Sequence, residues 1–169
     1  MVTPLHLRAA SAATEAEYKV KGGYLSNFGN FVDWPASAFS SRSSPFIIAV
    51  MDGNDAPAVL EQVFAGKSIA GHPVQVRTVS STPRDAHILL VTRTAGRSPE
   101  DVRGGLGGAP TLLVGETEQF AERGGIIGFV RDGENIRITL CLEHAAAAGL
   151  KVSARLATVA KAVKSKRGR

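Results

Sequence analysis

The chain has 169 residues, of which 44% are hydrophobic and 21% are charged. These proportions are typical of one globular domain and argue against a disordered or fibrous chain. The formal net charge is +5, but five of the 20 basic residues lie between Lys161 and Arg169. The remaining 15 basic residues equal the 15 acidic ones in number. The body of the chain is therefore neutral, which argues against a nucleic-acid-binding face.

The first 13 residues allow two interpretations. Ala10-Ser11-Ala12 resembles the small-residue tail before a signal-peptidase cleavage site, but no apolar core of about 7–15 residues precedes it. Residues 1–13 are therefore either a signal-peptide remnant or a disordered start. We expect a single domain at residues 14–163 and a basic tail at residues 164–169.

A helix is predicted to begin at Thr14 and to end near Val32. Thr14 and Glu17 have the spacing of a capping box, and apolar residues follow at helical spacing. Pro35 disfavours helical backbone at Trp34. Glycines within this helix weaken it, so we expect them to lie where another element packs closely.

Helices and buried strands alternate through the middle of the chain. Continuous apolar runs are typical of strands that are covered on both faces. The predicted strands are 46–51, 74–79, 87–91 and 111–114, and the predicted helices are 56–64 and 99–106. The alternation predicts an α/β fold, a three-layer sandwich with a central, mostly parallel sheet.

The C-terminal part follows a different pattern. Asp132-Gly133 lies between the apolar runs 126–130 and 136–140, which predicts an antiparallel hairpin near the C-terminus. A last helix is predicted over Ser153–Val163. Its apolar face would contain Leu156, Val159, Ala160 and Val163.

The sequence contains no complete motif for catalysis, metal binding or cofactor binding. Gly66-Lys67-Ser68 would end a phosphate-binding loop only if glycine stood in place of Glu61. The glycine run 104–108 precedes a strand, where no dinucleotide-binding turn is expected. The histidines (His6, His72, His87 and His144) lack metal-ligand spacing, and Cys141 has no local group that would activate it. We therefore predict a protein that is not an enzyme and carries no metal or cofactor.

Seven segments, in order, resemble the YfiR family. The opening signature is residues 18–35, YKVKGGYLSNFGNFVDWP. The other segments are FIIAVMDG at 46–53, GKSIAG at 66–71, AHILL at 86–90, TLLVGE at 111–116, GGIIGF at 124–129 with Phe120 before it, and AGLKVSARL at 148–156. Ala86 stands where relatives often have Cys, and Gly128 stands where they usually have Asn, so disulfides or ligand contacts at those positions do not carry over.

The resemblance implies a regulatory periplasmic domain, often dimeric. It implies a partner, the periplasmic domain of a membrane diguanylate cyclase or sensor kinase, and a role in cyclic-di-GMP signalling and biofilm control. It also implies an outer-membrane lipoprotein that relieves repression, and a small ligand. Two other functions stay open, a ligand-binding sensor without a repressor role and a small nucleotide-binding enzyme.

Six residues are candidates for partner or ligand contact. The aromatic ones either face the core or form an exposed anchor of the kind that dominates interface energies. The polar ones lie on the first helix, on the hairpin and in the last family segment. The six are Tyr24, Asn27, Phe31, Trp34, Arg137 and Ser153.

Overall fold

The computed structural model describes residues 4–51 and 55–166, with side chains from Thr14 onward in those ranges. An eight-stranded sheet forms its centre, in the order β10-β8-β7-β6-β5-β2-β4-β3. Its strands are β2 (Phe46–Met51), β3 (Ser68–Ile69), β4 (His72–Val79), β5 (Ile88–Val91), β6 (Leu112–Gly115), β7 (Ile127–Asp132), β8 (Asn135–Leu140) and β10 (Lys161–Ala162). From β4 to β7 every neighbouring pair is parallel, whereas β7 and β8 form an antiparallel hairpin. The predicted α/β fold and hairpin are confirmed.

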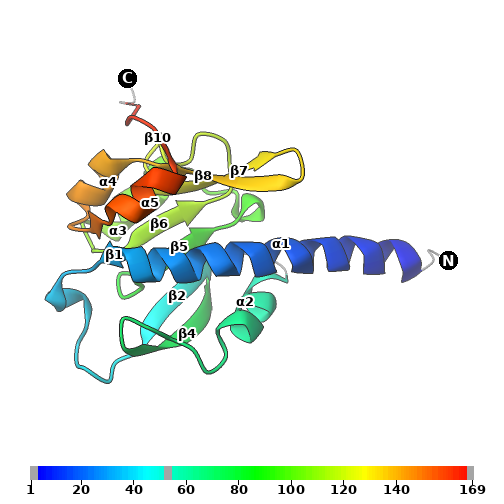
Figure 1. The fold of residues 1–169 in the computed structure, drawn as a ribbon, viewed down its shortest axis with the longest axis horizontal. Coiled ribbons are helices and arrows are strands. Elements are labelled where there is room, and N and C mark those ends of the chain that lie inside the picture. The colour runs from blue at the N-terminus through cyan, green and yellow to red at the C-terminus, as the bar shows by residue number, and fades with distance from the viewer. Residues whose placement is uncertain (1–3, 52–54, 167–169) are drawn as a thin grey trace.

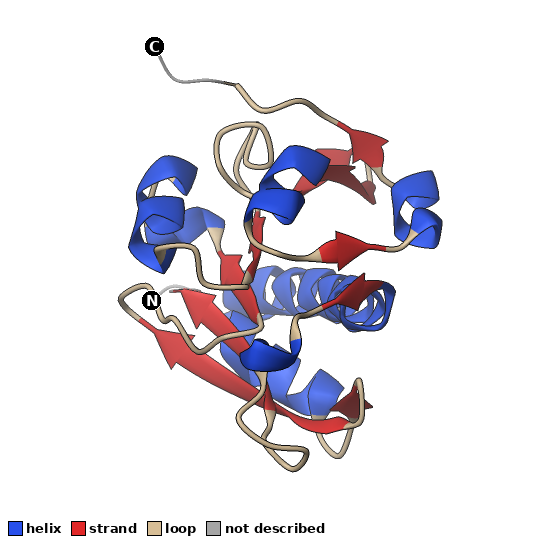
Figure 2. Cartoon of the chain, turned by 90° about the vertical axis from the view of Figure 1, so that its left-hand side faces the viewer, coloured by secondary structure: helices blue, strands red, loops and turns tan. Residues whose placement is uncertain are grey.

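Helices cover both faces of the sheet (Figure 1, Figure 2). They include α1 (Pro4–Phe31), α2 (Ala56–Phe64) and α3 (Pro99–Leu106). Alternate residues of β2 supply two separate hydrophobic clusters. Phe46 and Ile48 belong to the cluster with α1 and α2, and Ile47 and Ala49 belong to the cluster with α3. This division is the three-layer arrangement that the buried runs predict.

Helix α1 is longer than its sequence pattern predicts. It begins at Pro4 rather than at the Thr14 cap, and it continues well beyond the edge of the sheet (Figure 1). The alanines and leucines before Thr14 are strong helix formers, which outweigh the capping signal. A Cβ atom at Gly29 would lie 2.6 Å from Cγ2 of Ile69, so close packing explains this glycine.

The C-terminal region contains elements that the sequence pattern does not predict. These are α4 (Leu142–Ala147) and β9 (Lys151–Val152), which pairs antiparallel with β1 (Val32–Asp33). Helix α5 (Ala154–Val159) lies within the predicted last helix. Two short 3-10 helices, Ala36–Ala38 and Arg93–Ala95, lie in loops.

The predicted helix over 153–163 is wrong in its length and in its apolar face. Helix α5 ends at Val159, whose side chain is 71% exposed, and only Leu156 of the helix is buried. Lys161 and Ala162 instead pair in parallel with Thr139 and Leu140. The backbone hydrogen bonds of this strand pairing outweigh the short-range helical pattern. Among the described helices, none has the length and apolar character that crossing a membrane requires.

Candidate functional site

A groove of about 660 Å³ follows the β7–β8 hairpin and the outer edge of β8. On the side of β8 away from β7, β10 pairs with Thr139 and Leu140, and within the described chain no strand lies beside residues 135–138 on that side. We call this the hairpin groove. Its lining residues are Tyr24, Glu118, Gln119, Glu122, Val130, Arg131, Asp132, Ile136, Arg137, Ile138, Thr139, Val159 and Lys161.

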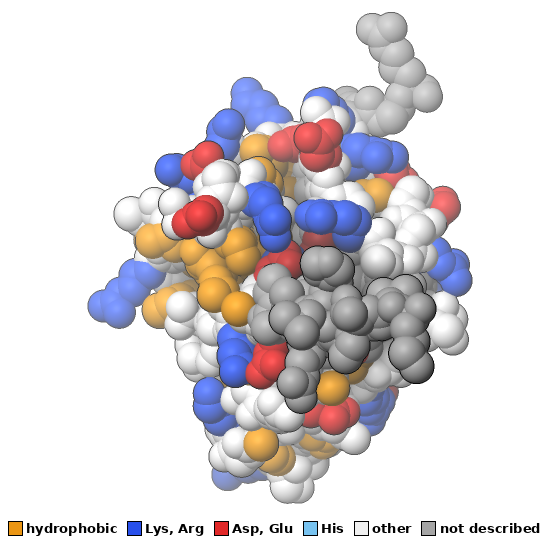
Figure 3. All heavy atoms as spheres, turned by 90° about the vertical axis from the view of Figure 1, so that its right-hand side faces the viewer, with side chains coloured by type: hydrophobic (Ala, Val, Ile, Leu, Met, Phe, Trp, Pro, Cys, Tyr) orange, Lys and Arg blue, Asp and Glu red, His pale blue; other side chains and the backbone are white. Residues whose placement is uncertain are grey.

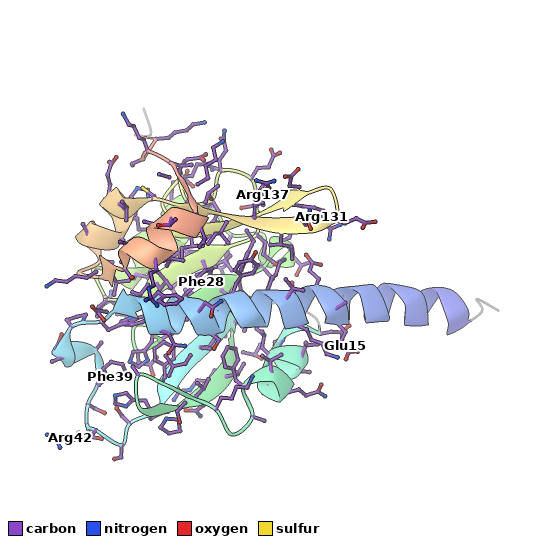
Figure 4. All side chains as sticks on the ribbon, in the orientation of Figure 1. Glu15, Phe28, Phe39, Arg42, Arg131 and Arg137 are labelled. Atoms are coloured by element: carbon purple, nitrogen blue, oxygen red, sulfur yellow. The ribbon has the colours of Figure 1, made fainter. Side chains whose placement is uncertain are left out.

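Strand alternation places the lining residues on both sides of the β8 edge. On the α1 side, the Tyr24 hydroxyl donates to the Ile136 carbonyl at 3.0 Å, and the Arg131 guanidinium lies 3.6 Å from a Glu17 carboxylate oxygen. On the other side, Arg137 Nε lies 2.5 Å from Asp132 Oδ2. Figure 4 shows Arg131 and Arg137 on the hairpin next to α1.

The hairpin groove combines three features that suit an extended peptide. An unpaired strand edge offers backbone donors and acceptors, and neighbouring pockets can take alternate side chains. Val130 is 39% exposed and Val159 is 71% exposed, so apolar contacts are available. Figure 3 shows Lys and Arg side chains together with a hydrophobic patch on the upper half of the face from which the hairpin projects.

A buried ionic network lies next to the hairpin groove. Lys21 on α1 forms an ion pair with Glu116, the residue that follows β6, and both side chains are 3% exposed. Lys21 Nζ also donates to Glu17 Oε1 at 2.8 Å. The Tyr18 hydroxyl and the Arg93 backbone N–H donate to Glu116 Oε1 at 3.0 Å and 2.9 Å. These contacts fix α1 against the carboxyl ends of β5 and β6.

The network changes the acidity of its members. Burial raises the pKa of Tyr18, and the negative charge of Glu116 raises it further, so Tyr18 acts as a hydrogen-bond donor. For Glu17, burial acts to raise the pKa, but the hydrogen bond from Lys21 and the charges of Lys21 and Arg131 lower it overall. Glu17 is thus ionised, and it joins the buried network to Arg131 at the groove.

The structure places two of the six candidate residues at the hairpin groove. Tyr24 and Arg137 both line the hairpin groove. Asn27 is exposed on α1 and does not line it. Phe31 and Ser153 meet elsewhere, where the Ser153 backbone N–H donates to the Phe31 carbonyl at 2.8 Å. Ser153 also caps α5, its hydroxyl accepting from the Arg155 N–H at 3.2 Å.

Trp34 takes part in an internal aromatic cluster. Its ring is half-buried, with its centroid 5.1 Å from that of Phe46 and 6.4 Å from that of His87. Its Nε1–H donates to the His87 carbonyl at 3.1 Å. His87 itself is buried, with Nδ1 accepting from the Ile47 N–H and Nε2 donating to the Ala38 carbonyl. The polar group of Trp34 is therefore already engaged within the domain.

Several residues of the site have only weak sequence signals. Arg131 and Lys161 look like ordinary exposed cations, and their proximity comes from the hairpin and from β10. The buried pair has a clearer signal, because Glu116 directly follows a buried strand and Lys21 falls on the apolar side of a helix. Among the described residues, no group of three or more His, Cys, Asp or Glu could hold a metal ion, and Cys141 is a buried free thiol.

Comparison with known proteins identifies the family. The profile of the YfiR/HmsC-like family matches residues 18–161. The chain belongs to the YfiR/HmsC-like family. This family is regulatory rather than catalytic. Its profile covers the hairpin groove and, apart from Glu17, the buried network, and it ends at Lys161.

The fold also resembles a solved structure, a conserved domain protein from Vibrio cholerae O1 biovar El Tor. The two share 14% sequence identity with a TM-score of 0.51, over 71% of this chain and 54% of that one. The chain thus spans about half the length of the solved structure, and the likeness concerns the fold. No curated protein matches the sequence.

Proposed function

We propose that this YfiR/HmsC-like protein is a noncatalytic periplasmic regulator that binds and restrains a membrane signalling protein of the diguanylate cyclase type. Family membership supports the regulatory role and the kind of partner. The Ala10-Ser11-Ala12 sequence is consistent with export. An outer-membrane lipoprotein that relieves the restraint, and a homodimer, belong to the same proposal.

The hairpin groove is the surface that we assign to the partner. The observation that carries this assignment is the free edge of β8 over residues 135–138, which lies between exposed apolar and cationic side chains. An extended partner segment would pair with β8 and compete with the Tyr24 hydroxyl for the Ile136 carbonyl. Arg137 on the outer side would meet a partner carboxylate in place of Asp132.

The test is a calorimetric titration of the purified chain with the purified periplasmic domain of a diguanylate cyclase from the same organism. Arg137→Ala should weaken binding about tenfold, the effect of losing one charge-assisted contact of roughly 1.4 kcal/mol. Val130→Lys should weaken it further, because a charge would replace an apolar contact. Arg42→Ala is the matched control, since Arg42 is exposed on the Ser-rich loop far from the hairpin (Figure 4).

Unaltered melting temperatures would show that each variant is folded. Tight binding that neither Arg137→Ala nor Val130→Lys changes would refute the groove as the contact surface. Failure of the unmodified chain to bind the cyclase domain would count against the regulator function itself. A sensor role for a small ligand is the second candidate function, and a cavity between α3 and α4 favours it.

A further inference from the structure

A cavity of about 170 Å³ lies between α3 and α4, which are neighbours on the left of Figure 1. Thr111 and His144 line it together with several apolar residues. The apolar lining residues are Leu106, Ala109, Leu113, Ile126, Ala147 and Ala148. An apolar cavity of about 150 Å³ is large enough to hold a benzene molecule. The space therefore fits an apolar group of about one ring.

The side-chain polar atoms of Thr111 and His144 in the cavity wall already have hydrogen-bond partners. His144 Nδ1 donates to the carbonyls of Ala121 and Gly125 at 2.9 Å and 2.7 Å, which leaves Nε2 to accept from the Ser165 hydroxyl at 2.9 Å. The Thr111 hydroxyl donates to the Ala86 carbonyl at 2.8 Å. These groups need no further polar partner inside the cavity, which favours an apolar occupant over water.

The mouth of the cavity is positively charged. A shallower groove of about 540 Å³ adjoins it and shares Arg103, Gly124 and His144 with it. Two further cations, Arg123 and Lys166, line this outer groove. Arg123 is paired with Glu100 at 2.8 Å, whereas Arg103 and Lys166 form no ion pair with any residue whose side chain the structure describes. Arg103 and Lys166 thus stand at the entrance without a carboxylate partner among the described side chains.

The C-terminal segment holds one of these cations in place. The Lys166 backbone N–H donates to the Glu122 carbonyl at 2.8 Å, and the Val163 N–H donates to the Leu140 carbonyl at 2.9 Å. Together with the contact between Ser165 and His144, these bonds dock the start of the basic tail against the outer groove. The position of Lys166 is a consequence of this docking.

We infer that this cavity binds a small organic carboxylate. Its apolar body, about one ring in size, would occupy the space between α3 and α4, and its carboxylate would pair with Arg103 and Lys166. Arg103 suits this role because a guanidinium binds a carboxylate through two parallel hydrogen bonds. The inference does not depend on the proposed cyclase partner, because the site lies entirely within this chain.

The experiment uses the full purified chain and benzoate as the probe, with benzyl alcohol as a neutral probe of similar size. Calorimetry and chemical-shift changes at the Ala147 and Ala148 amides should show saturable binding of benzoate, at least tenfold tighter than benzyl alcohol. Arg103→Gln should weaken benzoate binding about tenfold, and Arg42→Gln should leave it unchanged.

A second variant keeps the test decisive. Ala147→Leu should fill the cavity and abolish binding, and it should be tolerated because Ala147 is exposed. Equal binding of benzoate by the unmodified chain, Arg103→Gln and Ala147→Leu would place the ligand elsewhere and overturn the inference, as would no binding of benzoate at millimolar concentration. Because no partner protein is present, neither result bears on the cyclase interaction.

Discussion

Lys21 and Glu116 are 95 positions apart in the sequence and form a buried ion pair between α1 and the end of β6. Each residue has further partners, so that the pair is the centre of a network with Glu17, Tyr18 and the Arg93 backbone. Buried ion pairs stabilise little in total, but removal of one partner leaves the other charge without compensation. The pair therefore ties α1 to the end of β6.

Lys21→Met should lower the free energy of unfolding by about 3–5 kcal/mol, because Glu116 would stay buried without its cation. Urea denaturation followed by circular dichroism measures the change. Lys19→Met is the matched control, since Lys19 is 58% exposed and its pair with Glu15 lies at the surface. The control should lose less than about 1 kcal/mol. Equal small losses in both variants would contradict the structural role of the buried pair.

The free energy of unfolding should fall in mild acid, because His87 is held neutral in the native state. Burial lowers the pKa of its imidazole below the ordinary value of 6.5, although the Ala38 carbonyl acts in the opposite direction. The native state thus holds His87 neutral, whereas the unfolded chain takes up a proton below pH 6.5. The contribution of His87 is complete above that pH and is lost as the pH falls through the lowered native pKa.

The measurement is urea unfolding of the unmodified chain and His87→Gln at several pH values between 8 and 5. The stability difference between the two should shrink as the pH falls. His72→Gln is the control, because His72 belongs to the same aromatic cluster, with its ring stacked on Phe39 at a centroid distance of 4.0 Å. A difference that does not vary with pH for His87→Gln would show that His87 is protonated equally in both states.

Trp34→Ala should destabilise the domain by about 2–4 kcal/mol, because the indole packs on Phe46 and bonds the His87 carbonyl. Trp34→Phe keeps a ring on Phe46 and should lose about 1 kcal/mol, the value of one hydrogen bond. Chemical denaturation gives both values. If Trp34→Ala instead weakened cyclase binding without a change in stability, Trp34 would be a partner contact.

Gly125→Ala should cost about 1–3 kcal/mol or more through overpacking. A Cβ atom there would lie 2.2 Å from the Phe120 ring, and a Cβ atom at Gly115, the last residue of β6, would lie equally close to the same ring. Gly104→Ala is the control, because a Cβ at this position in α3 meets nothing within 4 Å. The control should gain about 0.5–1 kcal/mol from improved helix propensity. Thermal unfolding compares the two, and equal melting temperatures would contradict this account of Phe120.

The strands and helices of the central layer follow from local sequence. Residues 46–51 and 56–64 have the predicted structure at the predicted bounds, because apolar runs and helical spacing reflect burial directly. The structure of residues 153–163, a short helix followed by strand β10, could not be predicted in the same way. The short apolar pattern there fits a helix, but Lys161 and Ala162 pair with Thr139 and Leu140 of β8, and this pairing is not visible in the local sequence.

The candidate site, too, could be predicted from the sequence only in part. Tyr24 and Arg137 could be singled out as residue types, but their convergence on one groove depends on the β7–β8 hairpin and on the placement of α1. From the sequence, Trp34 is compatible with either a core residue or a surface anchor, and in the structure its half-buried ring packs against Phe46 and His87.

The sequence by itself determined the fold class, the order of the central elements and the family, because each rests on the identity of residues close together in the chain. Tertiary structure alone decided the Lys21–Glu116 pair, the open edge of β8 and the cavity between α3 and α4. Each of these depends on side chains brought together from distant segments, and their burial and charge balance exist only once the sheet and its covering helices have packed.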